Sequence, residues 1–145
     1  MERRKGFTLI ELVVEVMILG ILAAVAVPKL LTTTATATDN GLRQSLAVIR
    51  NAVEVYAANN GGKLPGGTSP TDESFKTDLK PYLRGEFPKC PVGAKDAVVK
   101  FSQEDATATM AGDGSSGWRF NTKDGRFIAN TTDKSSDGVT TYDKF

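Results

Sequence analysis

The chain has 145 residues, 40% of them hydrophobic and 24% charged, and its formal net charge is +1 at pH 7. Because the chain has so little excess charge, its composition does not indicate a nucleic-acid-binding protein. Histidine is absent, which removes the commonest general base and metal ligand. No nucleophile motif is present either, so the sequence argues against an enzyme.

The first predicted element is a long apolar segment behind a short cationic start. Arg3, Arg4 and Lys5 precede Gly6, and an apolar run with few polar interruptions continues over residues 7–31. The first 21 residues of this run, as a helix, would span about 31 Å, close to the hydrocarbon thickness of a bilayer. The cations predict that the N-terminus stays in the cytoplasm and that the chain after residue 31 lies outside.

Two ordinary interpretations of this segment are a secretory signal peptide and an uncut membrane anchor. Ala24-Val25-Ala26 would supply the cleavage site of a signal peptide. Glu11 and Glu15 argue against both, because a charge near the centre of a membrane helix costs about 2.5 to 3.5 kcal/mol. A disposable segment or a plain anchor gains nothing from these carboxylates.

A third interpretation explains Glu11. Residues 5–11, KGFTLIE, resemble the processing motif of the prepilin family, the precursors of type IV pilins and type II secretion pseudopilins. The resemblance implies that a prepilin peptidase cuts between Gly6 and Phe7 and methylates the new N-terminus. It also implies that Glu11 pairs with the freed amine of Phe7 on an adjacent subunit, and that Pro28 stands where such helices commonly carry a proline.

Glu15 is not explained in the same way. It lies one helical turn beyond Glu11 on the same face, where two carboxylates repel each other. Either Glu15 is protonated, or a second cation meets it, or local water tolerates it. The sequence leaves these alternatives open.

The next predicted element is a helix that supplies the core face of a globular head. A threonine-rich stretch over residues 32–41 weakens helix preference without forbidding it. The resemblance implies one long helix through this stretch, although Asp39 could instead cap a separate second helix. Arg43, Arg50 and Glu54 are expected to be solvated or to make subunit contacts. The predicted core stripe is Leu42, Leu46, Ile49, Val53 and Tyr56.

The middle of the chain predicts a short helix over residues 71–83, capped by Ser69 or Thr71 and ended near Pro81. The motifs PYL at 81–83 and PKCPVG at 88–93 resemble the connector of G-type major pseudopilins. Cys90, the single cysteine, is expected to be a small apolar residue in a turn, and a lone cysteine cannot close an intramolecular disulfide.

The rest of the chain predicts a small sheet. Residues 97–102, 117–121 and 126–130 form short β-prone runs, and Lys123-Asp124-Gly125 is a hairpin signal. Three antiparallel strands packed on the long helix would give a pilin-like α+β fold. Trp118 is expected in its core.

The polar C-terminal tail raises a calcium hypothesis, because G-type pseudopilins carry a calcium site in their C-terminal loop. The candidate ligands are Asp133, Ser136 and Asp137. The tail fits no EF-hand spacing, and a solvated polar loop is the alternative.

The resemblance implies three parts: a cytoplasmic leader at 1–6, a membrane-spanning and filament-core helix at 7–31, and a periplasmic head at 32–145. The implied function is a pseudopilin of a type II secretion filament in the bacterial inner membrane. Its implied partners are prepilin peptidase, further copies of itself, other pseudopilins, an inner-membrane platform and a cytoplasmic ATPase. The alternatives are a type IV or competence pilin and a membrane-anchored binding protein.

Overall fold

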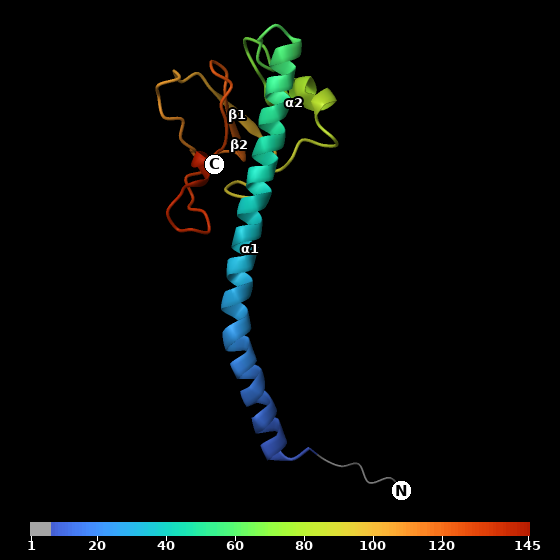
Figure 1. Ribbon diagram of the computed structural model, residues 1–145, viewed down its shortest axis with the longest axis vertical. Coiled ribbons are helices and arrows are strands. Elements are labelled where there is room, and N and C mark those ends of the chain that lie inside the picture. Colours follow the sequence, from blue (N-terminus) through green and yellow to red (C-terminus); the bar gives the residue numbers. More distant parts are fainter. Residues whose placement is uncertain (1–6) are drawn as a thin grey trace. The chain divides into compact units, whose positions relative to one another are not determined.

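The computed structural model describes residues 7–145, so the predicted leader and Gly6 lie outside the described residues. The chain separates into two compact units, with the division between Thr36 and Ala37. Each unit is considered by itself below. Figure 1 shows the path of the chain and labels its main elements.

Helix α1, Leu9–Asn59, is one α-helix of 51 residues that includes Pro28. The prediction of a single long helix is therefore confirmed, and the alternative of a second helix capped by Asp39 is wrong. In the stretch that follows the proline, threonine hydroxyls donate to carbonyls of the preceding helical turn. Thr32 donates to the carbonyl of Pro28 at 2.7 Å, and Thr33 donates to that of Lys29 at 2.8 Å. These hydrogen bonds give the threonine hydroxyls acceptors while the residues keep their helical conformation.

In the second unit, the predicted stripe of α1 forms one wall of the core. Leu42, Leu46, Ile49 and Val53 are buried, and Tyr56 packs at the edge. The stripe has the spacing of one helix face, so burying it against the sheet removes a continuous apolar surface from water. Gly62 follows the helix at φ +82°, and its N–H donates to the carbonyl of Ala57. This left-handed geometry ends the helix.

The second helix, α2, covers Asp72–Leu79 and is followed by the 3-10 helix η1, Lys80–Tyr82. Thr71 caps α2: its hydroxyl accepts from the N–H of Ser74, and its own N–H donates to the Ser74 hydroxyl. Of the two predicted caps, Thr71 is therefore the one used. Phe75 packs against the aromatic rings of the sheet, with its ring centroid 4.7 Å from that of Phe120.

The sheet has three strands in the order β1 (Val99–Ser102), β2 (Trp118–Asn121), β3 (Phe127–Ala129). The β2–β3 pair is antiparallel, and Gly125 in its turn has φ +77°, as the hairpin signal predicts. The predicted all-antiparallel sheet is corrected, because β1 and β2 pair in parallel. The connection over residues 103–117 is long enough to return the chain to the starting end, which a parallel pair requires. The predicted pilin-like α+β fold is otherwise confirmed.

Trp118 lies in the core, as predicted, and Cys90, which was expected in a turn, is buried there too. Trp118 is fully buried, and its indole N–H donates to the carbonyl of Pro88 at 2.9 Å. The Cys90 side chain is 1% exposed, and its burial raises the pKa of the thiol to about 11. A thiol with so high a pKa is mostly un-ionised at neutral pH, so the environment does not suit a reactive cysteine.

Candidate assembly site

The N-terminal end of α1 is built around a reciprocal contact between Thr8 and Glu11. The Glu11 carboxylate accepts from the Thr8 N–H at 2.9 Å and from the Thr8 hydroxyl at 2.7 Å. The Glu11 N–H in turn donates to the Thr8 hydroxyl at 3.3 Å. This arrangement is a capping box, which satisfies backbone donors that the first helical turn leaves without partners.

The capping role was not predicted for Glu11, although the signal was in the sequence. Thr8-Leu9-Ile10-Glu11 has the S/T-x-x-E spacing that places a side-chain acceptor three residues beyond a helix cap. The carboxylate therefore has an internal partner before any second subunit arrives. Its proposed pairing with the Phe7 amine stays a prediction, as does the cut between Gly6 and Phe7, because Gly6 lies outside the described residues.

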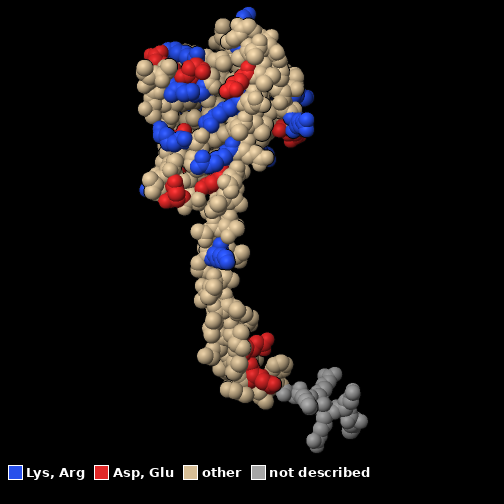
Figure 2. All heavy atoms as spheres, in the orientation of Figure 1, with Lys and Arg blue, Asp and Glu red and all other residues tan. Residues whose placement is uncertain are grey.

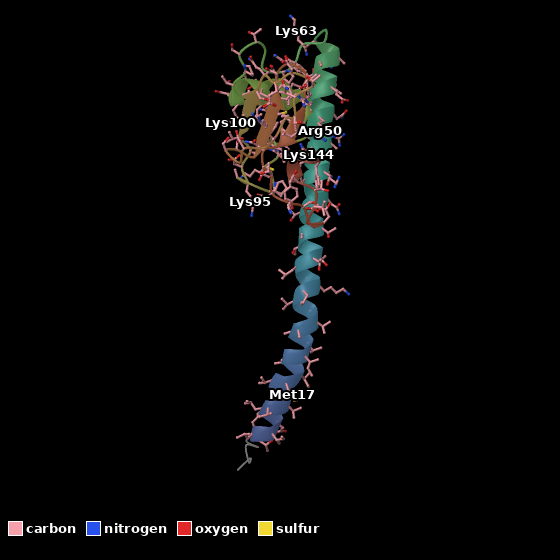
Figure 3. The ribbon with its side chains drawn as sticks, turned by 90° about the vertical axis from the view of Figure 1, so that its left-hand side faces the viewer. Met17, Arg50, Lys63, Lys95, Lys100 and Lys144 are labelled. Carbon is pink, nitrogen blue, oxygen red and sulfur yellow. The ribbon has the colours of Figure 1, made fainter. Side chains whose placement is uncertain are left out.

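The side chains on both sides of Glu11, from Phe7 to Leu31, form an apolar surface that no described residue of the chain covers. Phe7 is 79% exposed and Leu9 83% exposed, and the other large apolar side chains up to Leu31 are also exposed. Figure 3 labels Met17 on this part of α1. The helix is long and apolar enough to cross a membrane. An apolar surface of this extent indicates contact with lipid or with other protein chains.

In the second unit, Asp39 connects α1 to the C-terminal segment, residues 131–145. It is 7% exposed, and its carboxylate accepts from the Ser136 N–H at 3.0 Å, the Ser136 hydroxyl at 2.6 Å and the Tyr142 hydroxyl at 3.0 Å. Burial alone would raise the pKa of Asp39. The hydrogen bonds from Ser136 and Tyr142 and the charge of Arg43 outweigh burial, so the pKa lies below its ordinary value.

Two arginines of α1 extend this connection. Arg50 is half-buried against the head, which corrects the expectation that it is solvated or contacts another subunit, whereas Arg43 is exposed. Arg50, labelled in Figure 3, donates to the carbonyl of Phe127 at 2.8 and 3.0 Å and to the carbonyl of Phe145 at 3.0 Å. The guanidinium of Arg43 lies 3.7 Å from the ring centroid of Phe145. Contacts of this kind depend on segments about a hundred residues apart in the chain, so no local pattern predicted them. Glu54 is exposed, as expected.

Asp39 itself could have been noticed. It precedes Leu42 by three residues and so continues the spacing of the core stripe, which places a carboxylate where the pattern calls for an apolar side chain. A charged group on a core stripe needs a partner. The sequence does not say that the partners are Ser136 and Tyr142.

Two of the predicted calcium ligands, Ser136 and Asp137, form hydrogen bonds within the head. The Asp137 carboxylate accepts from the Ser135 hydroxyl at 2.7 Å and from the backbone N–H groups of Val139 and Thr140 at 2.8 Å each, while Ser136 is bound to Asp39. Over residues 7–145, no group of three or more acidic, cysteine or histidine side chains is placed to hold a metal ion. Calcium binding at Asp133, Ser136 and Asp137 stays a prediction.

Figure 2 shows a surface of mixed sign over the second unit, where Lys and Arg side chains alternate with Asp and Glu. Arg119 pairs with Glu104 at 3.1 Å and Lys123 with Asp105 at 2.7 Å. On the face that Figure 2 shows, side chains of both signs are interspersed, which agrees with the near-neutral composition.

The fold and the N-terminal site together define a class of protein: an α+β head carried by a long helix whose first part is apolar, with a carboxylate just inside the helix start. The family model described as the prokaryotic N-terminal methylation motif matches residues 1–27. The chain is 33% identical over 89 residues to the type IV narrow pilus major component PilA5 of Thermus thermophilus, which covers 52% of this chain and 77% of that protein.

Two further relatives carry different names. The type II secretion system core protein G of Klebsiella pneumoniae is 35% identical over 60 residues, covering 41% of this chain and 43% of that protein. The type IV major pilin protein PilE1 of Neisseria gonorrhoeae is 37% identical over 111 residues, covering 77% of this chain and 60% of that protein. No solved structure matches the chain significantly. The chain belongs to the prepilin family of type IV pilins and pseudopilins, whose members are structural subunits rather than enzymes.

Proposed function

We propose that the chain is a pseudopilin, a structural subunit of the periplasmic filament of a type II secretion system. Prepilin peptidase would cut it between Gly6 and Phe7 in the inner membrane. The N-terminal part of α1 would then leave the bilayer and pack with its counterparts on other subunits, with the head outside. A cytoplasmic ATPase and an inner-membrane platform would drive this assembly, and other pseudopilins would join the filament.

The observation that carries this proposal is the uncovered apolar surface of α1 behind the capped Glu11. A helix buried inside its own domain would show one covered stripe, whereas these side chains are exposed all round. Such a helix can be surrounded by lipid in the membrane and by identical helices in the assembled filament. The Glu11 carboxylate gives the second state an advantage, because a neighbouring subunit can offer the cationic amine of Phe7 while the bilayer core cannot.

The proposed role in a type II secretion system is supported by the similarity to core protein G and by the connector motifs at 81–83 and 88–93. The single buried cysteine also excludes a disulfide-closed C-terminal loop, which long adhesive pilins usually carry. A type IV pilus subunit is the second candidate. The observation that favours it is the coverage of the narrow pilus component, of which this chain spans 77%.

The first experiment is the intact mass of the protein extracted from its native membrane. We expect a species that begins at Phe7 and carries one added methyl group. A species that begins at Val27, after a cut by signal peptidase, or an uncut chain would overturn the filament proposal. Deleting the gene then separates the two candidates: a pseudopilin is required for protein export, and a pilin for surface pili.

A further inference from the structure

Two charged side chains interrupt the apolar part of α1 and have no role in the capping box. The side chains of Glu15 and Lys29 are both exposed, and among residues 7–145 neither side chain forms a hydrogen bond or an ion pair. Their neighbours Val14, Val16 and Leu30 are exposed apolar side chains. Any partner that covers this apolar surface therefore also covers a carboxylate and an ammonium group.

The spacing of the two charges excludes a bond between them in one subunit. They are 14 residues apart, which is about 21 Å along a helix with a rise of about 1.5 Å per residue. The same spacing is close to a whole number of turns, so the two side chains lie within about 40° of each other around the helix axis. Glu15 and Lys29 thus project to the same side of α1 at different heights.

A bilayer treats the two groups differently. Lys29 lies 22 residues after Phe7, about 33 Å along the helix, where the hydrocarbon layer of about 30 Å ends and the ammonium group reaches water. Glu15 lies 8 residues after Phe7, about 12 Å along the helix and inside that layer. The bilayer therefore leaves the carboxylate without a cation, while Lys29 is already solvated.

We propose that Glu15 of one subunit forms an ion pair with Lys29 of a second copy of this chain. The proposal rests on the filament function above. In a parallel bundle around a common axis, side chains on one helix face point to the same interior. A shift of about 21 Å between two helices would bring the ammonium group of one to the height of the carboxylate of the other.

Glu11 is the competing partner for Lys29, since it lies 18 residues before Lys29 on the same face. Its carboxylate, however, already accepts two hydrogen bonds from Thr8, whereas that of Glu15 accepts none from the described residues. A buried carboxylate with no hydrogen bond and no counter-charge is the more costly of the two. An ion pair with Lys29 would therefore neutralise the Glu15 carboxylate, which has no partner in the capping box.

The test is a double-mutant cycle of charge-removing variants in the full-length protein. The measured quantity is the yield of filaments sheared from the cells, compared between variants whose membranes contain equal amounts of the subunit. We expect Glu15→Gln alone and Lys29→Gln alone each to lower the yield at least tenfold, at roughly 1.4 kcal/mol per factor of ten, because each leaves one buried charge unpaired. The double variant should recover to within about threefold of the parent. Glu11→Gln combined with Lys29→Gln is the matched control and should show no recovery.

Chemical cross-linking tests the geometry independently. In a Cys90→Ala background, thiols introduced by Glu15→Cys and Lys29→Cys should be joined in filaments by a short bismaleimide. Because each subunit then carries both ends of the link, the product should be a ladder of multimers. Either cysteine variant alone should give no cross-linked product, whereas contact between like positions would give dimers. Val13→Cys with Val27→Cys has the same spacing on another face and should give no ladder.

The outcomes separate the two proposals. If the parent chain is uncut or forms no filaments, the filament function fails and this inference fails with it. If filaments form, three results would overturn only the Glu15–Lys29 pair. The single variants could assemble normally, the losses of the two single variants could add in the double variant, or the variant that combines Glu11→Gln with Lys29→Gln could recover the filament yield.

Discussion

Replacing Asp39 by alanine should destabilise the head, because this carboxylate is the common acceptor for three donors of the C-terminal segment. Hydrogen bonds to an ionised group contribute about 1.5 to 3 kcal/mol each when measured singly. The three are not additive here. Ser136 is exposed, so its two donors can turn to water, whereas Tyr142 is 8% exposed and its hydroxyl would lose its partner.

We therefore expect Asp39→Ala to lower the free energy of unfolding by about 2 to 3 kcal/mol. For a head of this size the midpoint of thermal unfolding should fall by roughly 10 to 15 °C. The measurement is urea and thermal unfolding of the full chain in detergent micelles, followed by the fluorescence of Trp118. This residue is the single tryptophan and lies in the core of the head, so its signal reports on that unit.

Two variants make the result specific. Tyr142→Phe removes only the buried hydroxyl and should cost about 1 kcal/mol. Glu54→Ala removes an exposed carboxylate from the same helix and should change stability by less than about 0.5 kcal/mol. If Asp39→Ala were no more destabilised than Glu54→Ala, the connection between α1 and the C-terminal segment would not hold the head together.

Acid should weaken the head, because the pKa of Asp39 is lowered and hydrogen bonds from Ser115 and Asn130 hold that of Asp113 at about 2. A carboxyl group with a lower pKa in the folded state stabilises above its unfolded pKa, so the urea midpoint should be constant near pH 6 and fall as the pH drops from about 4 towards 2. The Cys90 thiol, with a pKa of about 11, should not react with Ellman's reagent at pH 8 until the head unfolds, and thiol release should follow the tryptophan signal. Calcium should leave the melting temperature within about 1 °C of its value in EGTA, because the Asp137 carboxylate is already bonded within its own loop; a rise of several degrees that EGTA reverses would instead establish the predicted site.

Local patterns in the sequence determined much of this protein. The apolar run, the core stripe from Leu42 to Tyr56, the capped helix at Thr71 and the hairpin at Gly125 each depend on residues within a few positions of one another. Periodicity and turn chemistry act over that range, so these elements are found where they were predicted. The processing motif belongs to the same class of short signals, and the family model matches it.

The tertiary structure decided what depends on distant segments. The parallel pairing of β1 with β2 follows from the long connection between them, and strand patterns alone do not distinguish parallel from antiparallel neighbours. Asp39 and Arg50 are charged residues on a helix, which a sequence places in water by default, yet their partners lie 97, 77 and 95 residues away. Burial of a charge is favourable only where the fold brings donors and acceptors to it, and that meeting is a property of the folded chain.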